Sequence, residues 1–358
     1  MRRGPTLDTR CSRSRNARSP SKLGAATVLW PQAAHRSSTG TGLGGTRMAA
    51  AGRRAHDTRV EAGAAQRIFS LDTFFPAFCG LVLVLIWSRP ELFPDPVYPS
   101  ALFALLGLLA WLLARAAAAA PRLALPLAVA GGGAMLLAIY CALAEVLPWS
   151  LPGGREDWLR SADRAFFRYD WQSWWGGLAH PGLSDALALV YTGFYLCPLV
   201  LGWSLARRRD WDGLYGCLDR VLLAFLLSYC GYLLVPARSP YEIQRFAAAF
   251  PDGVLSPFLF RHTIGLTGTR HDCFPSGHVL ITCYVAWLSW KRARAVFAPL
   301  ALWAALTLLA TLYLRYHYLV DVLAGVAAAA VVIPLFERLF RAAGAGAAPL
   351  PYAAEERR

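Results

Sequence analysis

The chain has 358 residues, enough for one large domain or two ordinary ones. Apolar residues make up 56% of the chain and charged residues 16%, whereas a soluble domain typically carries about 25% charged residues. With 13 Trp, 14 Tyr and 18 Phe, this composition excludes a purely soluble, fibrous or disordered protein and predicts an integral membrane protein with a polar N-terminal tail.

The tail, residues 1–67, carries 13 Arg or Lys against 3 Asp or Glu, and so +10 of the total net charge of +14. It is rich in Arg, Ser, Gly and Ala and has no helical or strand periodicity, so we expect it to be disordered. A basic tail can bind nucleic acid, but this one precedes a series of apolar stretches. We therefore expect retention on the cytoplasmic side and no nucleic-acid partner. The sequence leaves open whether translation starts at Met1 or Met48.

Apolar stretches follow one another from Ile68 onward, and about 20 apolar residues suffice to cross a bilayer. We expect an all-α membrane protein with about eight transmembrane helices. Their expected positions are 68–88, 97–114, 123–147, 186–206, 218–236, 275–290, 295–314 and 317–336. Asp72 and Pro76 interrupt the first stretch, and the sixth is short.

Basic residues predict the orientation of these spans. Arg or Lys clusters occur after the second, fourth, sixth and eighth stretches, at Arg115 and Arg122, Arg207–Arg209, Lys291–Arg294, and Arg338 and Arg341. The positive-inside rule places all four clusters, and both termini, in the cytoplasm. We expect a multi-pass protein of the bacterial inner membrane, with the two long loops, 148–185 and 237–274, in the periplasm.

This organisation predicts five segments. They are a basic cytoplasmic tail at 1–67, N-terminal transmembrane helices at 68–147, an amphipathic extracytoplasmic segment at 148–185, a transmembrane core at 186–336 and a cytoplasmic tail at 337–358. The Trp-rich segment 148–185 fits either a helix lying in the membrane interface or an ordinary aromatic belt.

The first motif of chemical interest is Phe274-Pro275-Ser276-Gly277-His278, at the outer start of the sixth stretch. Pro suits the first turn of a helix, and Gly277 lets another group approach the backbone closely. Free N–H groups at a helix start favour an anion, and His278 could donate a proton to a group bound there. A helix cap with an incidental His is the alternative.

The second motif runs from Arg315 to Asp321, Arg-Tyr-His-Tyr-Leu-Val-Asp, at the outer start of the eighth stretch. His317 and Asp321 are four residues apart and share a face if this segment is helical. The carboxylate could then fix the imidazole tautomer and leave the other ring nitrogen free as a nucleophile. A structural ion pair is the alternative, but both motifs start outward-facing helices and can therefore meet.

PSGH followed by H-x-x-x-D, in this order, resembles the type 2 phosphatidic acid phosphatase superfamily, and the resemblance covers about residues 186–336. It implies a six-helix phosphatase-like core at the C-terminal side and a site at the extracytoplasmic face. It further implies phosphoryl transfer through a phosphohistidine without metal or cofactor, so we expect a membrane-embedded lipid phosphate phosphatase or phosphotransferase. The partners would be a lipid phosphate or phospholipid substrate and the bilayer itself.

By this resemblance His317 is the catalytic nucleophile, Asp321 the carboxylate that orients it and His278 the acid that protonates the leaving group. Ser276 and the amide of Gly277 would bind phosphate. Arg238 stands where the family has a phosphate-binding Arg.

Two positions depart from the family pattern. Gly231 stands where the family has a Lys, and Thr311 where it usually has an Arg. We expect Arg315 and Arg270 to supply phosphate contacts beside Arg238. These departures resemble the inositolphosphotransferase-like branch, in which the acceptor is an alcohol such as a ceramide.

Other classes of protein compete with this interpretation. A transporter could use charges such as Glu145, Asp219 and Arg220, although they lie near predicted span ends, where local pairing suffices. A non-catalytic membrane protein of the same fold is a further alternative. A zinc site could combine His271, Cys273, His278 and His317, but their spacing matches no zinc pattern.

Overall fold

Long apolar helices make up most of this computed structural model, which describes residues 70–120, 123–151, 155–167, 178–244 and 252–345. These residues contain no strand beyond one isolated bridge between Ala237 and Asp272. All of them belong to one compact unit, residues 51–358. The all-α membrane class predicted from the sequence is confirmed, and the predicted tail at 1–67 lies outside the described residues.

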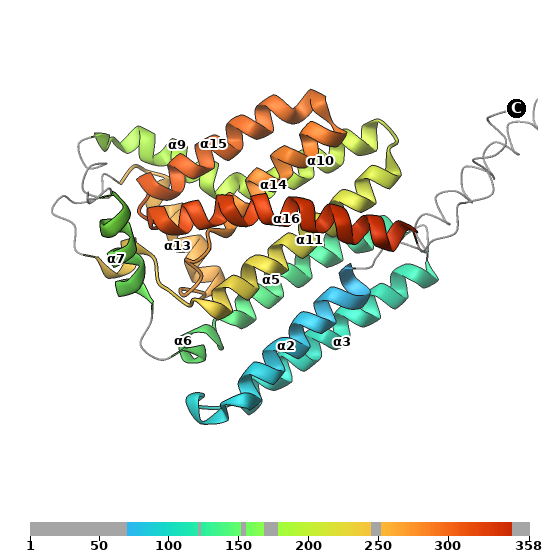
Figure 1. Ribbon diagram of the computed structural model, residues 1–358, viewed down its shortest axis with the longest axis horizontal. Helices are drawn as coiled ribbons and strands as arrows, with labels where there is room; N and C mark the ends of the chain where they lie inside the picture. The colour runs from blue at the N-terminus through green and yellow to red at the C-terminus, as the bar shows by residue number, and fades with distance from the viewer. Residues whose placement is uncertain (1–69, 121–122, 152–154, 168–177, 245–251, 346–358) are drawn as a thin grey trace, which may run out of the picture. The chain divides into compact units, whose positions relative to one another are not determined.

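The N-terminal helices pack side by side, as Figure 1 shows for α2 and α3. They are η1 (Ser70–Phe74), α2 (Phe75–Ser88), η2 (Pro90–Leu92), α3 (Val97–Ala119), α4 (Ala124–Pro126), η4 (Leu127–Gly131) and α5 (Gly132–Leu143). The two residues that interrupt the first apolar stretch both fall at its beginning. Asp72 pairs with Arg115 of α3 at 2.8 Å, and Pro76 lies in the first turn of α2, where its missing N–H costs nothing.

Two short helices, α6 (Leu147–Ser150) and α7 (Glu156–Phe167), lie within the long segment predicted to be extracytoplasmic. Helix α7 contacts α16, and Figure 1 shows it at the end of the helix group where α16 begins. Its apolar side carries Leu159, which is fully buried. Helix α7 is therefore amphipathic, and its apolar side packs on protein.

The C-terminal part holds the remaining helices. They are α9 (Pro181–Thr192), η6 (Gly193–Tyr195), α10 (Leu196–Arg207), α11 (Trp211–Leu234), α12 (Pro240–Ile243), α13 (Ser256–Thr267), α14 (Gly277–Arg292), η7 (Arg294–Val296), α15 (Phe297–Tyr313) and α16 (Leu319–Ala345). Helices α9 and α11 begin several residues before the predicted spans because His180 and Asp210 cap them. The His180 side chain accepts from the N–H of Gly182 at 3.1 Å, and Asp210 accepts from that of Gly213 at 2.9 Å. Helix α16 also continues into the predicted C-terminal tail.

Seven helical segments within the described residues are long and apolar enough to cross a membrane. They are Leu71–Ser88, Val97–Ala119, Ala124–Leu143, Pro181–Arg207, Trp211–Leu234, Arg294–Tyr313 and Leu319–Phe340. The sixth predicted span corresponds to α14, which has only 16 residues. Because α14 is packed among α10, α11, α15 and α16, its length need not match the bilayer (Figure 1).

Two of the basic clusters meet at the end of α14 opposite its start. A guanidinium nitrogen of Arg208, after α10, donates to the carbonyl oxygen of Arg292 at 2.8 Å. Arg220 of α11 pairs with Glu337 of α16 at 3.2 Å. This charge therefore has a local partner, and it needs no ion path to explain its position. The basic residues and the two histidine motifs therefore lie at opposite ends of α14.

Candidate active site

The PSGH and HxxxD motifs meet at the starts of α14 and α16. The backbone N–H of Ser276 donates to the carbonyl oxygen of Asp321 at 3.1 Å. Gly325, one turn further along α16, permits this approach, because a Cβ there would lie 2.7 Å from the carbonyl oxygen of Ser276. Two residues 45 positions apart in sequence thus join the two motifs through one hydrogen bond.

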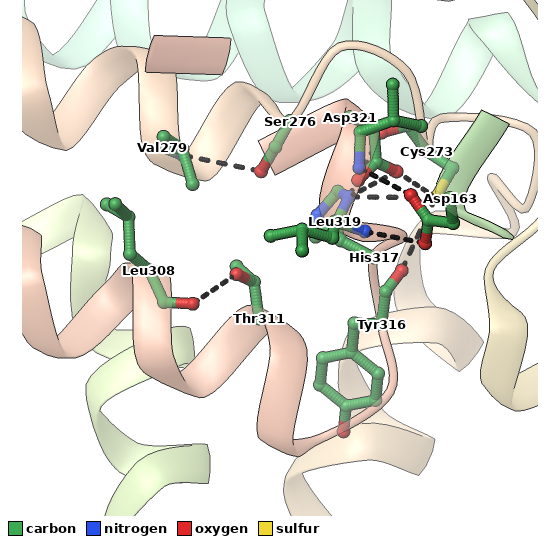
Figure 2. A network of polar contacts seen from close by, with 11 residues as sticks. Asp163, Cys273, Ser276, Val279, Leu308, Thr311, Tyr316, His317, Leu319 and Asp321 are labelled. Carbon is green, nitrogen blue, oxygen red and sulfur yellow. Dashed lines mark hydrogen bonds and ion pairs between the residues drawn. The ribbon is translucent and has the colours of Figure 1, made fainter. Parts of the chain in front are cut away.

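His317 lies in the turn just before α16 and is held through its Nδ1 atom (Figure 2). Nδ1 lies 3.0 Å from the carbonyl oxygen of Cys273 and 3.3 Å from Oδ2 of Asp321. Because a carbonyl oxygen only accepts hydrogen bonds, Nδ1 carries the proton and Nε2 keeps its lone pair. Only 4% of the His317 side chain is exposed, and Asp321 is fully buried. This arrangement leaves one ring nitrogen available as a nucleophile.

Cys273 also contacts the carboxylate, since its thiol donates to Oδ2 of Asp321 at 2.8 Å. Cys273, His317 and Asp321 form the one group of His, Cys and acidic side chains, within the described ranges, that is close enough to hold a metal ion. Hydrogen bonds already join these three side chains. The zinc site considered from the sequence is not assembled, because His271 and His278 lie outside this group.

His278 faces His317 across a cavity of about 90 Å³. The two imidazole centroids are 6.1 Å apart. The His278 ring stacks on Tyr191 at 3.9 Å and contacts Phe194 at 4.1 Å, so both of these aromatic rings restrict its orientation. Both imidazoles line this cavity, so one bound group could contact both rings.

The cavity is rich in tyrosine and poor in cations. Its lining consists of Tyr140, Ala188, Tyr191, Thr192, Phe194, Tyr195, Ser239, Glu242, Leu259, Phe260, Thr267, Thr269, Arg270, Asp272, Cys273, His278, Tyr316 and His317. Among these described residues Arg270 is the one Arg or Lys, and it lies 3.7 Å from Glu242. Burial raises the pKa of Glu242 and of Asp272.

Arg238 and Arg315 do not line this cavity. Arg238 is half-exposed, and its N–H and Nε donate to Oε1 of Glu156 in α7 at 3.1 and 3.0 Å. Burial raises the pKa of Glu156, but hydrogen bonds and charge from Arg238 outweigh it, so the pKa lies below its usual range. Arg315 is 3% exposed and has a φ of +61°, in the turn between α15 and α16.

Ser276 and Gly277 form the start of α14 and are buried. The Ser276 hydroxyl caps the helix by accepting from the N–H of Val279 at 3.5 Å (Figure 2). No described group accepts a hydrogen bond from the N–H of Gly277 or of His278. Gly277 cannot be larger without movement, because a Cβ would lie 2.3 Å from the Tyr232 hydroxyl of α11.

Both positions that depart from the family pattern are closely packed. A Cβ at Gly231 would lie 2.2 Å from the Pro275 ring, so a larger residue would require movement of the PSGH motif. Thr311 is fully buried, and its backbone carbonyl oxygen accepts from the N–H groups of Tyr316 and His317 at 3.1 and 3.2 Å. The backbone at Thr311 therefore helps to shape the turn that carries His317.

Sequence reasoning missed a third element of the site, Asp163 of α7. Its carboxylate accepts from the N–H of Leu319 at 2.9 Å and of Val320 at 2.7 Å, and so caps α16 (Figure 2). The start of α16 is therefore occupied by a carboxylate, which leaves the start of α14 as the helix terminus open to an anion. No local pattern signals this cap, because donor and acceptor are 156 residues apart.

Residues 157–335, half of the chain, match the PAP2 superfamily. The match begins at the second residue of α7 and ends within α16, so it contains both histidine motifs and the Asp163 cap. No curated protein and no solved structure matches the chain. With half of its residues matched and its motifs joined in one buried junction, the chain belongs to the PAP2 superfamily.

Proposed function

We propose that this protein transfers a phosphoryl group from a membrane lipid through a phosphohistidine on His317. The observation that carries the proposal is the pairing of Nδ1 with Cys273 and Asp321, which leaves Nε2 as the free nucleophilic nitrogen. Membership of the PAP2 superfamily supports phosphatase or phosphotransferase activity of this kind.

The proposed reaction has two steps. Nε2 of His317 attacks phosphorus, the phosphorus–oxygen bond to the lipid breaks, and His278 gives its proton to the leaving alkoxide. Water or an alcohol then loses a proton to His278 and attacks the phosphohistidine, which releases Nε2. We expect the amides of Gly277 and His278 and the side chain of Arg270 to balance the phosphoryl charge; His278 and Arg270 line the cavity, and Gly277 does not. Half-exposed Arg238, next to the lining residue Ser239, would guide the anion inward.

We further propose that this site faces the periplasm. The two histidine motifs lie at the end of α14 opposite the Arg208 and Arg292 cluster, which the positive-inside rule assigns to the cytoplasm. A lipid could then present its headgroup to the cavity while its chains stay in the bilayer.

The test uses purified protein in mixed micelles, with a panel of lipid phosphates and with p-nitrophenyl phosphate, in the presence of EDTA. We expect release or transfer of phosphate by the parent protein and none by His317→Ala. Full loss of activity with EDTA, restored by added zinc, would instead make Cys273, His317 and Asp321 a metal site.

The low cation content of the cavity favours a second candidate, transfer from a phosphodiester lipid to an alcohol. A phosphate monoester carries a charge of about −1.5 to −2 at neutral pH, whereas a diester carries one charge and needs fewer cations. Arg270 is the one cation among the described lining residues, and hydroxyl-rich groups could bind Tyr, Glu242 and Asp272. Faster phosphate release from phosphatidic acid than headgroup transfer from phosphatidylinositol to an added ceramide would contradict this candidate.

A further inference from the structure

An apolar groove of about 440 Å³ lies between α5, α10 and α11, beside the catalytic cavity. Its size is within the range of roughly 300–1,000 Å³ found for small-molecule sites. Its lining comes from described residues of α4, η4, α5, η6, α10 and α11 and includes Gly133, Leu137, Tyr140, Leu199 and Trp203. No Asp, Glu, Lys or Arg is among these described residues, so the groove suits hydrocarbon.

The groove adjoins the catalytic cavity, because Tyr140 and Tyr195 line both. Tyr140 ends the groove at the cavity, and its hydroxyl donates to the carboxylate of Asp272. The backbone carbonyl of Tyr140 also accepts from the hydroxyl of Thr269 at 2.8 Å. The position of α5 is therefore tied by hydrogen bonds to the loop that leads into PSGH.

The groove also opens sideways toward the position of the bilayer. Leu137 of α5 and Leu199 and Trp203 of α10 all line it, and their exposed fractions are 53%, 55% and 58%. A hydrocarbon chain could thus enter from the membrane without crossing water.

We propose that this groove holds one hydrocarbon chain of the lipid whose phosphate reacts at His317, and that α5 sets the chain length accepted. This inference rests on the proposed function. Helix α5 lies outside residues 157–335, the part that matches the superfamily, so this selectivity would be a property added by the N-terminal helices. Because a chain in the bilayer is already in hydrocarbon, the groove selects by shape and gains little hydrophobic free energy.

Gly133 offers a direct way to fill the groove. It lies seven residues before Tyr140 on α5, about 10 Å further from the catalytic cavity at 1.5 Å per residue. A Cβ at Gly133 would meet no atom within 4 Å, so the space beside it is open. Gly80 of α2 has equally open space but does not line the groove, which makes it a matched control.

The experiment compares Gly133→Leu, Gly133→Ala and the control Gly80→Leu on dioctanoyl and dipalmitoyl phosphatidic acid and on p-nitrophenyl phosphate. We expect Gly133→Leu to lower kcat/KM for the dipalmitoyl lipid, relative to the dioctanoyl lipid, by about tenfold or more. Gly133→Ala and Gly80→Leu should leave this ratio unchanged, and all three variants should hydrolyse p-nitrophenyl phosphate normally. An unchanged ratio in Gly133→Leu would overturn the inference.

If Gly133→Leu fails to fold, Leu137→Trp replaces it, because that half-exposed position at the groove mouth tolerates a larger ring. A readout without turnover separates the two proposals. A phosphatidic acid with a diazirine near the end of one acyl chain should label α5, α10 or α11 in the parent protein, and less so in the groove-filling variant. Labelling confined to α2 and α3 would refute the groove, whereas groove labelling without turnover would refute only the proposed function.

Discussion

The carbonyl oxygen of Cys273 decides which nitrogen of His317 can react. It fixes the proton on Nδ1, and Asp321 adds a second acceptor for the same proton. Among the described residues no carbonyl or carboxylate holds the His278 ring in this way, and its aromatic neighbours Tyr191 and Phe194 restrict its orientation. The two histidines therefore have different environments, which suits one to attack phosphorus and the other to move a proton.

We predict that substitutions at the two histidines differ in their dependence on the leaving group. His317→Ala should abolish turnover and any covalent phosphoenzyme. His278→Ala should slow reaction of natural lipid esters by roughly 10²–10⁴-fold, the usual contribution of a general acid, but slow p-nitrophenyl phosphate much less because its leaving group is stable without a proton. Steady-state kinetics on both substrates measure this difference. Equal losses on both substrates, or labelled phosphate trapped on His278, would show that the roles are reversed.

We predict that Asp321→Asn loses more activity than His278→Ala and less than His317→Ala. The amide would keep the imidazole near its place but would no longer hold the charge that stabilises one tautomer. The measurement is kcat on p-nitrophenyl phosphate, with Glu337→Gln at the opposite end of α16 as the control for a lost carboxylate. A variant as active as the parent protein would remove Asp321 from the mechanism.

Gly277 provides a test of close packing at the start of α14. The Cβ of Gly277→Ala would overlap the Tyr232 hydroxyl, and overpacking of this kind costs about 1–3 kcal/mol. We expect a lower Tm and lower kcat in Gly277→Ala, and recovery of both in the double variant Gly277→Ala/Tyr232→Phe, which lacks the overlapping oxygen. The controls are Tyr232→Phe alone and Gly80→Ala, whose Cβ meets no atom within 4 Å. No recovery in the double variant would show that another contact excludes the methyl group.

Among the helices, α7 links two parts of the site that are far apart in sequence. Glu156 at its start binds Arg238, and Asp163 near its end caps α16 two residues after His317. Leu159 is buried between these two contacts, with Ala237, Cys273 and Tyr318 in the same apolar cluster. Helix α7 therefore fixes the turn that carries the proposed nucleophile.

We predict that Asp163→Ala destabilises the protein by about 2 kcal/mol, the order expected when a cap with two charged hydrogen bonds is removed. Without this cap the start of α16 is no longer held in place beside His317, so kcat should fall as well. Asp157→Ala is the matched control on the same helix, since Asp157 is 92% exposed and pairs only locally with Arg160 in the contacts described. Thermal unfolding in detergent and turnover of p-nitrophenyl phosphate measure both effects. Equal behaviour of the two variants would mean that the cap is dispensable.

At the scale of the whole molecule, the basic loops and the two histidine motifs lie at opposite ends of α14. The loops with Arg208 and Arg292 meet at one end, while the histidine motifs, α7 and α13 lie at the other (Figure 1). Such an asymmetry is what fixes the orientation of a membrane protein during insertion. The orientation stays a proposal that labelling can test.

We predict that Val254→Cys reacts with a membrane-impermeant thiol reagent in intact cells, whereas Ala295→Cys reacts only after lysis. Val254 is 85% exposed in the loop before α13, and Ala295 is exposed in η7 at the basic end. Neither substitution changes a charge. Labelling of the parent protein gives the baseline for its native thiols. The reverse pattern would place the histidine motifs in the cytoplasm.

The sequence by itself determined the class of fold and the approximate place of seven of the eight expected spans, because apolar stretches of membrane length are a local property. The remaining one, at 275–290, corresponds to α14, which has only 16 residues. The sequence also predicted both histidine motifs, since PSGH and HxxxD are short local patterns that can be recognised without knowledge of any tertiary contact. Span ends such as Pro181 and Trp211 were shifted because single capping residues, His180 and Asp210, set them.

Only the tertiary structure decided which groups share the site. The Asp163 cap, the Cys273 carbonyl and the contribution of α5 through Tyr140 each join residues more than 40 positions apart. The same packing sets the close approach of Gly231 to the Pro275 ring, where a Cβ would lie 2.2 Å from the ring. These relations depend on how helices cross, and crossing geometry is set by the summed packing of many side chains and not by any local pattern.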